Sequence, residues 1–313
     1  MKLTLILLNK SCAMALMAFV GFIISKVGLV NVNESKILSQ LVLYVLFPCT
    51  LIECFQRTYD MRILQNLSIS LLASILIHVV NIVLLRGLRK FPGKMSAAEG
   101  SCVMYTNAGS LVAPMIMATL GGEYVIYSCS YLAVQNILMW THGRTILQSH
   151  ADKESISLKM ILCNPCMLAI AIGLSCFLLR ITFPQMVSDT ISSMAACIAP
   201  ISMLGIGILM ANLDLKEIYR QPRVYYIVSL RLIIFPLVII CLLFLISKSL
   251  GVPDVLAVTL LCAIGPSGTT MVQFAQIFDN PECGLMSSVN IVTTMCCVIT
   301  MPLMFGLYHM IVY

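Results

Sequence analysis

The chain has 313 residues, of which 60% are hydrophobic and only 10% are charged, with a formal net charge of +6. Because soluble domains carry about 25% charged residues, so few charges could not cover a water-exposed surface. The composition excludes an ordinary soluble protein and predicts a protein embedded in a lipid bilayer. No Lys- and Arg-rich run with interleaved aromatic residues is present, so no nucleic-acid partner is expected.

In chain order, the sequence predicts about ten apolar segments of the length that crosses a bilayer as an α-helix, which takes about 20 residues. The first contains Lys10 and is followed by many more, so we interpret it as an uncleaved membrane helix rather than a signal peptide. The predicted spans cover residues 4–28, 36–56, 64–86, 96–120, 124–147, 159–180, 186–211, 223–247, 254–277 and 284–311. The predicted fold class is therefore an all-α membrane protein.

The distribution of Lys and Arg predicts the orientation of these spans. If the N-terminus lies outside, the cytoplasmic loops hold twelve Lys and Arg residues and the outer loops hold six. Because cytoplasmic loops are enriched in Lys and Arg, we expect both termini outside, in a multi-pass protein of the cell (plasma) membrane.

An internal repeat divides the chain into residues 1–150 and 151–313, with five spans in each part. An odd number of spans inverts the second copy, and inverted repeats are a recurring architecture of secondary transporters. An offset of 152 residues aligns Gly21 with Gly173, Pro48 with Pro200, and Pro114 with Pro266.

The fourth and ninth predicted spans each contain a polar stretch with glycine and proline, at 105–114 and 265–270. Proline and glycine weaken a helix, and an interrupted membrane helix survives where it lines a wet cavity or is buried in protein. Two interruptions in corresponding spans point to a substrate site, whose half-helix N-termini would suit an anionic group. The alternative is that these are ordinary packing kinks. The candidate substrate-binding residues are Thr106, Asn107, Gly109, Ser110, Pro114, Pro266, Ser267, Thr269 and Thr270.

Few ionisable residues fall within the predicted spans, and such residues are candidates for function. His78 could couple protons or simply pack, and Arg231 could reach toward water or cap a packed interface. Asp189, Glu53 and Glu99 are expected near the membrane surfaces. We interpret the cysteines and methionines as apolar packing residues, so we expect no metal site and no cofactor.

Several motifs resemble the auxin efflux carrier family, which includes plant auxin exporters and bacterial malate and malonate permeases. The resemblance covers nearly the whole chain. It rests on Asn107-x-Gly109 with Pro114, on Tyr127, Asn136, Trp140, Thr141 and Gly143, on Asn164-Pro165, on Pro200, Ser202, Gly205, Gly207 and Ala211, and on Ala263, Gly265 and Pro266. Many relatives carry other residues at Val112, Thr269 and Thr270, next to the candidate site.

The resemblance implies two inverted five-helix repeats with broken, crossing fourth and ninth helices. It further implies a mobile transport domain that moves against a scaffold of the first, second, sixth and seventh spans. The substrates it suggests are small organic anions.

These observations predict a secondary active transporter, a permease that moves a small mono- or dicarboxylate by alternating access. The proton gradient or the membrane potential would drive transport. The expected partners are the lipid bilayer and the substrate, and the sequence does not decide whether the protein forms a homodimer. The alternative is a membrane-embedded sensor or channel-like protein with the same fold. An enzyme is not expected, because neither Gly-x-Ser-x-Gly nor a buried carboxylate pair is present.

Overall fold

The computed structural model describes residues 2–30, 37–38, 40–90, 95–148, 164–211 and 221–312. Throughout this part the ordered elements are helices, and no strand forms within it, so the predicted all-α class is confirmed. The one extended pairing found in these residues is an isolated antiparallel bridge between Thr106 and Ser267.

Several helices are interrupted or change pitch along their length, and η marks a π-helical turn. The elements before residue 150 are α1 (Lys2–Lys26), η1 (Val42–Leu46), α3 (Phe47–Phe55), α4 (Met61–Leu88), α5 (Ala97–Met104), η2 (Ala108–Val112), α6 (Ala113–Thr119), α7 (Gly122–Leu138), η3 (Met139–Gly143) and α8 (Arg144–Leu147). Those after residue 150 are α10 (Pro165–Leu179), α11 (Gln185–Ala196), α12 (Ile198–Ala211), α14 (Pro222–Ser229), η4 (Leu230–Ile234), α15 (Phe235–Leu250), α16 (Pro253–Ile264), α17 (Thr269–Ile277) and α18 (Cys283–Val312).

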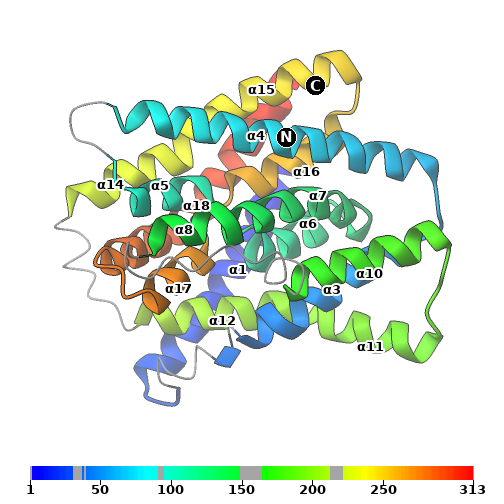
Figure 1. Cartoon of the computed structure of the whole chain (residues 1–313). Helices are drawn as coiled ribbons and strands as arrows, with labels where there is room; N and C mark the ends of the chain where they lie inside the picture. Colours follow the sequence, from blue (N-terminus) through cyan, green and yellow to red (C-terminus); the bar gives the residue numbers. More distant parts are fainter. Residues whose placement is uncertain are drawn as a thin grey trace.

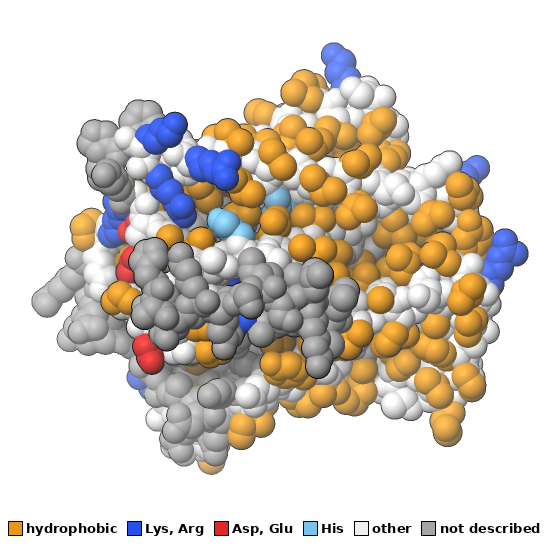
Figure 2. Space-filling view, viewed as in Figure 1, with side chains coloured by type: hydrophobic (Ala, Val, Ile, Leu, Met, Phe, Trp, Pro, Cys, Tyr) orange, Lys and Arg blue, Asp and Glu red, His pale blue; other side chains and the backbone are white. Residues whose placement is uncertain are grey.

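Five helical stretches in the described residues are long and apolar enough to cross a membrane. They are Leu8–Lys26, Met61–Leu88, Gln185–Ala211, Pro222–Leu250 and Cys283–Val312, and shorter apolar helices accompany them. Figure 2 shows hydrophobic side chains spread over the face between basic side chains at opposite ends of the molecule. This distribution is typical of a protein whose middle lies in lipid and whose ends reach water.

Three of the π-helical turns end two residues before a proline. A proline has no N–H, and its ring clashes with the carbonyl four residues earlier, so the preceding turn widens. The widened turn is closed by a bond that spans five residues: Phe47 N–H to Val42 O, Ala113 N–H to Ala108 O, and Phe235 N–H to Leu230 O. Pro48, Pro114 and Pro236 therefore stay within continuous helix.

The helices pack as two groups. One group, called the scaffold group here, consists of α1 and η1–α3 with α10, α11 and α12; α1 packs on α12, and α3 packs on α10 and α11. The other, called the core group, consists of α4, α5–α6, α7–α8, α14–α15, α16–α17 and α18. In Figure 1, α3, α10, α11 and α12 lie along the lower side, and α4 and α15 lie along the upper side.

Glycine allows the closest approaches within the scaffold group. A Cβ added to Gly21 would lie 2.3 Å from the carbonyl oxygen of Leu204, and one added to Gly173 would lie 2.6 Å from the ring of Phe55. Gly21 and Gly173 are the two glycines that the 152-residue offset aligns. Both therefore occupy helix contacts where no side chain fits.

Candidate functional site

Two interrupted helices cross near the middle of the molecule. The helix α5 ends at Met104 and η2 begins at Ala108, while α16 ends at Ile264 and α17 begins at Thr269. The two extended connections are joined by the isolated antiparallel bridge: the N–H of Asn107 donates to the carbonyl of Pro266 at 2.9 Å, and that of Gly268 donates to the carbonyl of Tyr105 at 2.9 Å. Both predicted interruptions are thus present, and they contact each other directly.

The helix that follows each interrupted helix, α7 after α5–α6 and α18 after α16–α17, supplies hydrogen bonds to the crossing. On α7, the side-chain oxygen of Gln135 accepts from Thr106 N–H at 3.0 Å and from its hydroxyl at 2.8 Å, and its Nε2 donates to Thr106 O at 2.9 Å. On α18, Asn290 Nδ2 donates to Ser267 O at 2.6 Å, and Thr293 Oγ1 accepts from Ser267 N–H at 3.1 Å. The unwound backbone therefore has the partners that membrane depth requires.

At the crossing, the two N-terminal half-helix ends lie on one side and the two C-terminal ends lie on the other. The N-terminal ends of η2 and α17 border one cavity, which Asn107 and Thr269 line. The C-terminal ends of α5 and α16 contact Arg231, which donates hydrogen bonds to Val103 O, Ala263 O and Gly265 O. Because a helix N-terminus carries partial positive charge, the cavity side of the crossing is electropositive without a charged side chain.

The cavity has a volume of about 360 Å³ and lies between the scaffold group and the core group. Its described lining contains no Lys, Arg, His, Asp or Glu. Amides, hydroxyls and aromatic rings make up much of the lining: Tyr44, Phe47, Thr106, Asn107, Ser110, Gln135, Asn136, Trp140, Asn164, Ser202, Thr269, Thr270 and Gln273.

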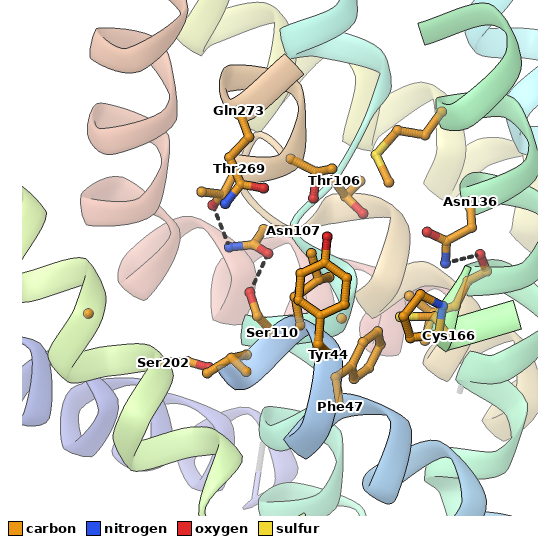
Figure 3. Close-up of a pocket in the computed structure, with 18 of the residues that line it drawn as sticks. Tyr44, Phe47, Thr106, Asn107, Ser110, Asn136, Cys166, Ser202, Thr269 and Gln273 are labelled. Carbon is orange, nitrogen blue, oxygen red and sulfur yellow. Dashed lines mark hydrogen bonds between the residues drawn. The ribbon is translucent and has the colours of Figure 1, made fainter. Parts of the chain in front are cut away.

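Asn107 joins the two halves of the chain at the cavity wall. Its Nδ2 donates to Thr269 Oγ1 at 3.2 Å, and its Oδ1 accepts from Ser110 Oγ at 2.5 Å. Figure 3 shows Asn107 between these two residues, with the rings of Tyr44 and Phe47 nearby. Asn107 is 8% exposed, so it keeps a surface toward the cavity while its amide is oriented by both partners.

The structure gathers six of the nine candidate residues at the cavity: Thr106, Asn107, Gly109, Ser110, Thr269 and Thr270. Pro266 and Ser267 form the crossing itself and do not line the cavity. Pro114 differs most from expectation, because the fourth span is interrupted at residues 105–107 and not at this proline. Pro114 instead lies in the first turn of α6, where the widened turn η2 accommodates it.

Gly109 faces the scaffold group across the cavity rim. A Cβ at this position would lie 2.5 Å from Cζ of Phe47, closer than side chains approach each other. The glycine thus allows η2 of the core group to contact α3 of the scaffold group.

Sequence reasoning missed several residues of this region. Gln135 could have been predicted, because it is a polar residue in an apolar segment and polar residues in membrane helices are candidates for function. Tyr44, Phe47 and Gln273 gave no such signal, because aromatic and amide residues near a helix end have many roles.

The ionisable candidates lie away from the cavity. His78 is buried, its Nδ1 lies 2.7 Å from Ser74 O, and its ring packs 5.0 Å from that of Tyr131. Glu99 forms a capping box with Ser96 and an ion pair with Arg223.

For Asp189 the sequence predicts a position near a membrane surface, and for Arg231 it leaves two alternatives, reaching toward water or capping a packed interface. Asp189 is exposed, and its Oδ1 accepts a hydrogen bond from Gln185 Nε2. Arg231 is fully buried, so the expectation that it could reach water is wrong, and its alternative role as a cap is confirmed.

Apolar helices of membrane-crossing length, together with a cavity that holds amide and hydroxyl groups at the crossing of two interrupted helices, are typical of membrane transporters. The sequence profile described as membrane transport protein matches residues 10–305. The chain belongs to this family, the auxin efflux carrier group that its motifs resemble. Among curated proteins, none matches the chain.

Proposed function

We propose that this protein is a secondary active transporter that moves a small organic anion, such as a mono- or dicarboxylate, across the plasma membrane. The observation that carries the proposal is the pair of helix N-termini, η2 and α17, that border one cavity whose described lining has amides and hydroxyls and no Lys, Arg, His, Asp or Glu. Helix N-termini offer N–H donors without intrahelical acceptors, and each stabilises an anion by about 0.3–1 kcal/mol, or up to about 2 kcal/mol when partly buried.

The chemistry of the lining favours an anion over a cation. A cation in the cavity would face two positive helix ends, and the described lining offers it no carboxylate. A carboxylate would find donors in the amides of Asn107 and Asn136 and in the hydroxyl of Thr270. A volume of about 360 Å³ suits a small ligand.

The position of the cavity supports alternating access by an elevator-like motion. Its walls come from both groups: Tyr44, Phe47 and Ser202 belong to the scaffold group, and Asn107 and Thr269 belong to the core group. A shift of the core group along the scaffold group would carry the crossing and its ligand together, and close the cavity on one side. The proton gradient or the membrane potential would supply the energy.

Two features support the proposed pair of inverted repeats, residues 1–150 and 151–313. In each part, the helix after the interrupted helix, α7 or α18, hydrogen-bonds the unwound backbone. The aligned glycines Gly21 and Gly173 are both close-contact positions. With ten spans, both termini would lie on the same side of the membrane, and the distribution of Lys and Arg favours the outside.

A thermal-shift screen of the purified protein tests the substrate class. Small monocarboxylates, dicarboxylates and indole acids form one panel, and amines and neutral sugars form the other. We expect saturable stabilisation by at least one carboxylate, because a ligand of the folded state raises the unfolding temperature. Uptake of that ligand into proteoliposomes then tests transport. Stabilisation by cations or sugars alone would contradict the anion proposal.

A further inference from the structure

Arg231 carries a charge into the interior of the molecule and has no carboxylate partner among the described residues. It lies in η4 and is 0% exposed. Its guanidinium donates only to backbone carbonyls: Nε to Gly265 O at 3.0 Å, Nη1 to Val103 O at 2.9 Å, and Nη2 to Ala263 O at 2.8 Å and Gly265 O at 2.5 Å. A buried charge is costly unless something of opposite sign faces it.

The three carbonyls that face Arg231 belong to the C-terminal ends of the interrupted helices. Val103 lies in the last turn of α5, and Ala263 and Gly265 lie at the end of α16. The last carbonyls of a helix have no intrahelical donor and carry the negative end of its dipole. Two such ends therefore converge on one guanidinium, which provides the opposite charge and the missing donors together.

Converging carbonyls of half-helix ends are also how membrane transporters coordinate small inorganic cations. Here the position between the carbonyls is occupied by a side chain of the protein. Pro236 contributes to this placement, because the π-helical turn before it includes residue 231. The guanidinium reaches across from α14–α15 to both interrupted helices, which come from different halves of the chain.

We propose that Arg231 is a built-in cation that occupies a carbonyl-lined cation site at the crossing, so that the core group assembles without sodium or another inorganic cation. Each of the four half-helix ends then has an opposite charge available. The protein supplies it at the two C-terminal ends, and an anionic ligand supplies it at the two N-terminal ends. Only this last point rests on the proposed function.

The wild-type protein provides the first test. Its thermal unfolding is measured in sodium, potassium, choline and N-methylglucamine chloride at equal ionic strength. We expect equal unfolding temperatures, because the site already holds its cation. A saturable stabilisation that only sodium or only potassium produces would overturn the proposal. No transported substrate is needed, so failure here is distinct from failure of the proposed function.

Chemical rescue provides the second test. The Arg231→Ala variant vacates the site, and we expect its unfolding temperature to be several degrees lower. Ethylguanidinium, which matches the deleted atoms, should raise this temperature selectively over N-methylglucamine. Arg223→Ala is the matched control, because Arg223 lies on the same long helix but pairs with Glu99 and is partly exposed. Rescue of both variants alike, or no loss of stability in Arg231→Ala, would overturn the proposal.

Two further variants keep the test decisive if Arg231→Ala cannot be purified. Arg231→Lys retains the charge with fewer donors, and Arg231→Gln retains a donor without the charge. If the site requires a cation, Arg231→Lys has the higher unfolding temperature of the two, and it remains indifferent to sodium. If Arg231→Gln is equally or more stable, hydrogen bonding alone explains the residue and the proposal is wrong.

Discussion

At the scale of single residues, Asn107 links the two halves of the chain at the cavity wall through its side chain. Its amide holds Ser110 of its own helix and Thr269 of the other interrupted helix. Because the Thr269 hydroxyl is neutral, the Nδ2 donor of Asn107 can exchange this bond for one to an anionic ligand. Hydrogen bonds to charged groups contribute about 1.5–3 kcal/mol, compared with about 1 kcal/mol for neutral pairs.

We expect Asn107→Ala to reduce carboxylate transport by about ten- to a hundredfold, which corresponds to the loss of one such bond. The protein should remain folded, because only two neutral hydrogen bonds are removed. Uptake into proteoliposomes measures the effect, and size-exclusion elution confirms folding. Asn66→Ala, outside the cavity lining, is the control; unchanged transport by Asn107→Ala would remove this residue from the site.

Gly109 makes a second prediction at this scale. Gly109→Ala places a methyl group against the ring of Phe47, and we expect a stability loss of about 1–3 kcal/mol together with impaired transport. Adding Phe47→Leu should restore part of both, since it frees the space. Gly284→Ala, at a glycine with nothing within 4 Å, is the matched control. Equal effects at Gly109 and Gly284 would show that the contact does not matter.

At the scale of elements, each interrupted helix depends on the helix that follows it in the chain. Gln135 of α7 satisfies three polar groups of Thr106, and Asn290 and Thr293 of α18 satisfy the backbone of Ser267. The crossing is therefore a four-helix unit rather than a contact of two helices. Its stability should respond to side chains that never touch a ligand.

Gln135→Leu leaves the buried groups of Thr106 without these partners, and each such group costs about 1–3 kcal/mol. We expect a clear fall in unfolding temperature. Asn136→Leu, one residue further, should have a much smaller effect on stability, because Asn136 donates only to Leu132 O within its own helix. Thermal unfolding of the two variants compares them directly. Similar losses for both would contradict the role assigned to Gln135.

The prolines show what sequence could and could not predict at this scale. The polar, glycine-bearing stretches correctly marked the interrupted spans. Pro114 lies in the stretch 105–114 that predicts the interruption, but a proline permits either a break or a π-helical turn. At Pro114 the helix forms the π-helical turn η2 and does not break. The choice depends on whether neighbouring helices can satisfy an unwound backbone, which is a property of packing and not of local sequence.

At the scale of the whole molecule, the scaffold and core groups meet at a pair of cysteines. Cys54 of α3 and Cys129 of α7 are both buried, and their sulfur atoms lie 3.3 Å apart. If transport moves the core group along the scaffold group, this separation must change during each cycle. A covalent link between the two sulfurs would then hold the protein in the present state.

We expect diamide, which accepts two electrons and two protons as the two thiols join, to arrest transport, and dithiothreitol to restore it. Peptide mass spectrometry would detect the loss of two hydrogens in the linked peptides. Cys54→Ser should transport normally after the same treatment, which controls for the other cysteines. Full transport by the linked protein would rule out motion between α3 and α7.

The sequence by itself determined that the protein is embedded in a lipid bilayer, that its fold class is all-α, and which stretches interrupt two of its helices. These follow from composition and from short runs of proline, glycine and polar residues, whose effects are local. Only the tertiary structure decided that the interruptions are joined by an antiparallel bridge, that Gln135 and Asn290 support them, and that Arg231 is buried rather than directed to water. The partners of Arg231 come from α5 and α16, far apart in the chain. Their convergence results from helix packing in three dimensions, and no local pattern encodes it.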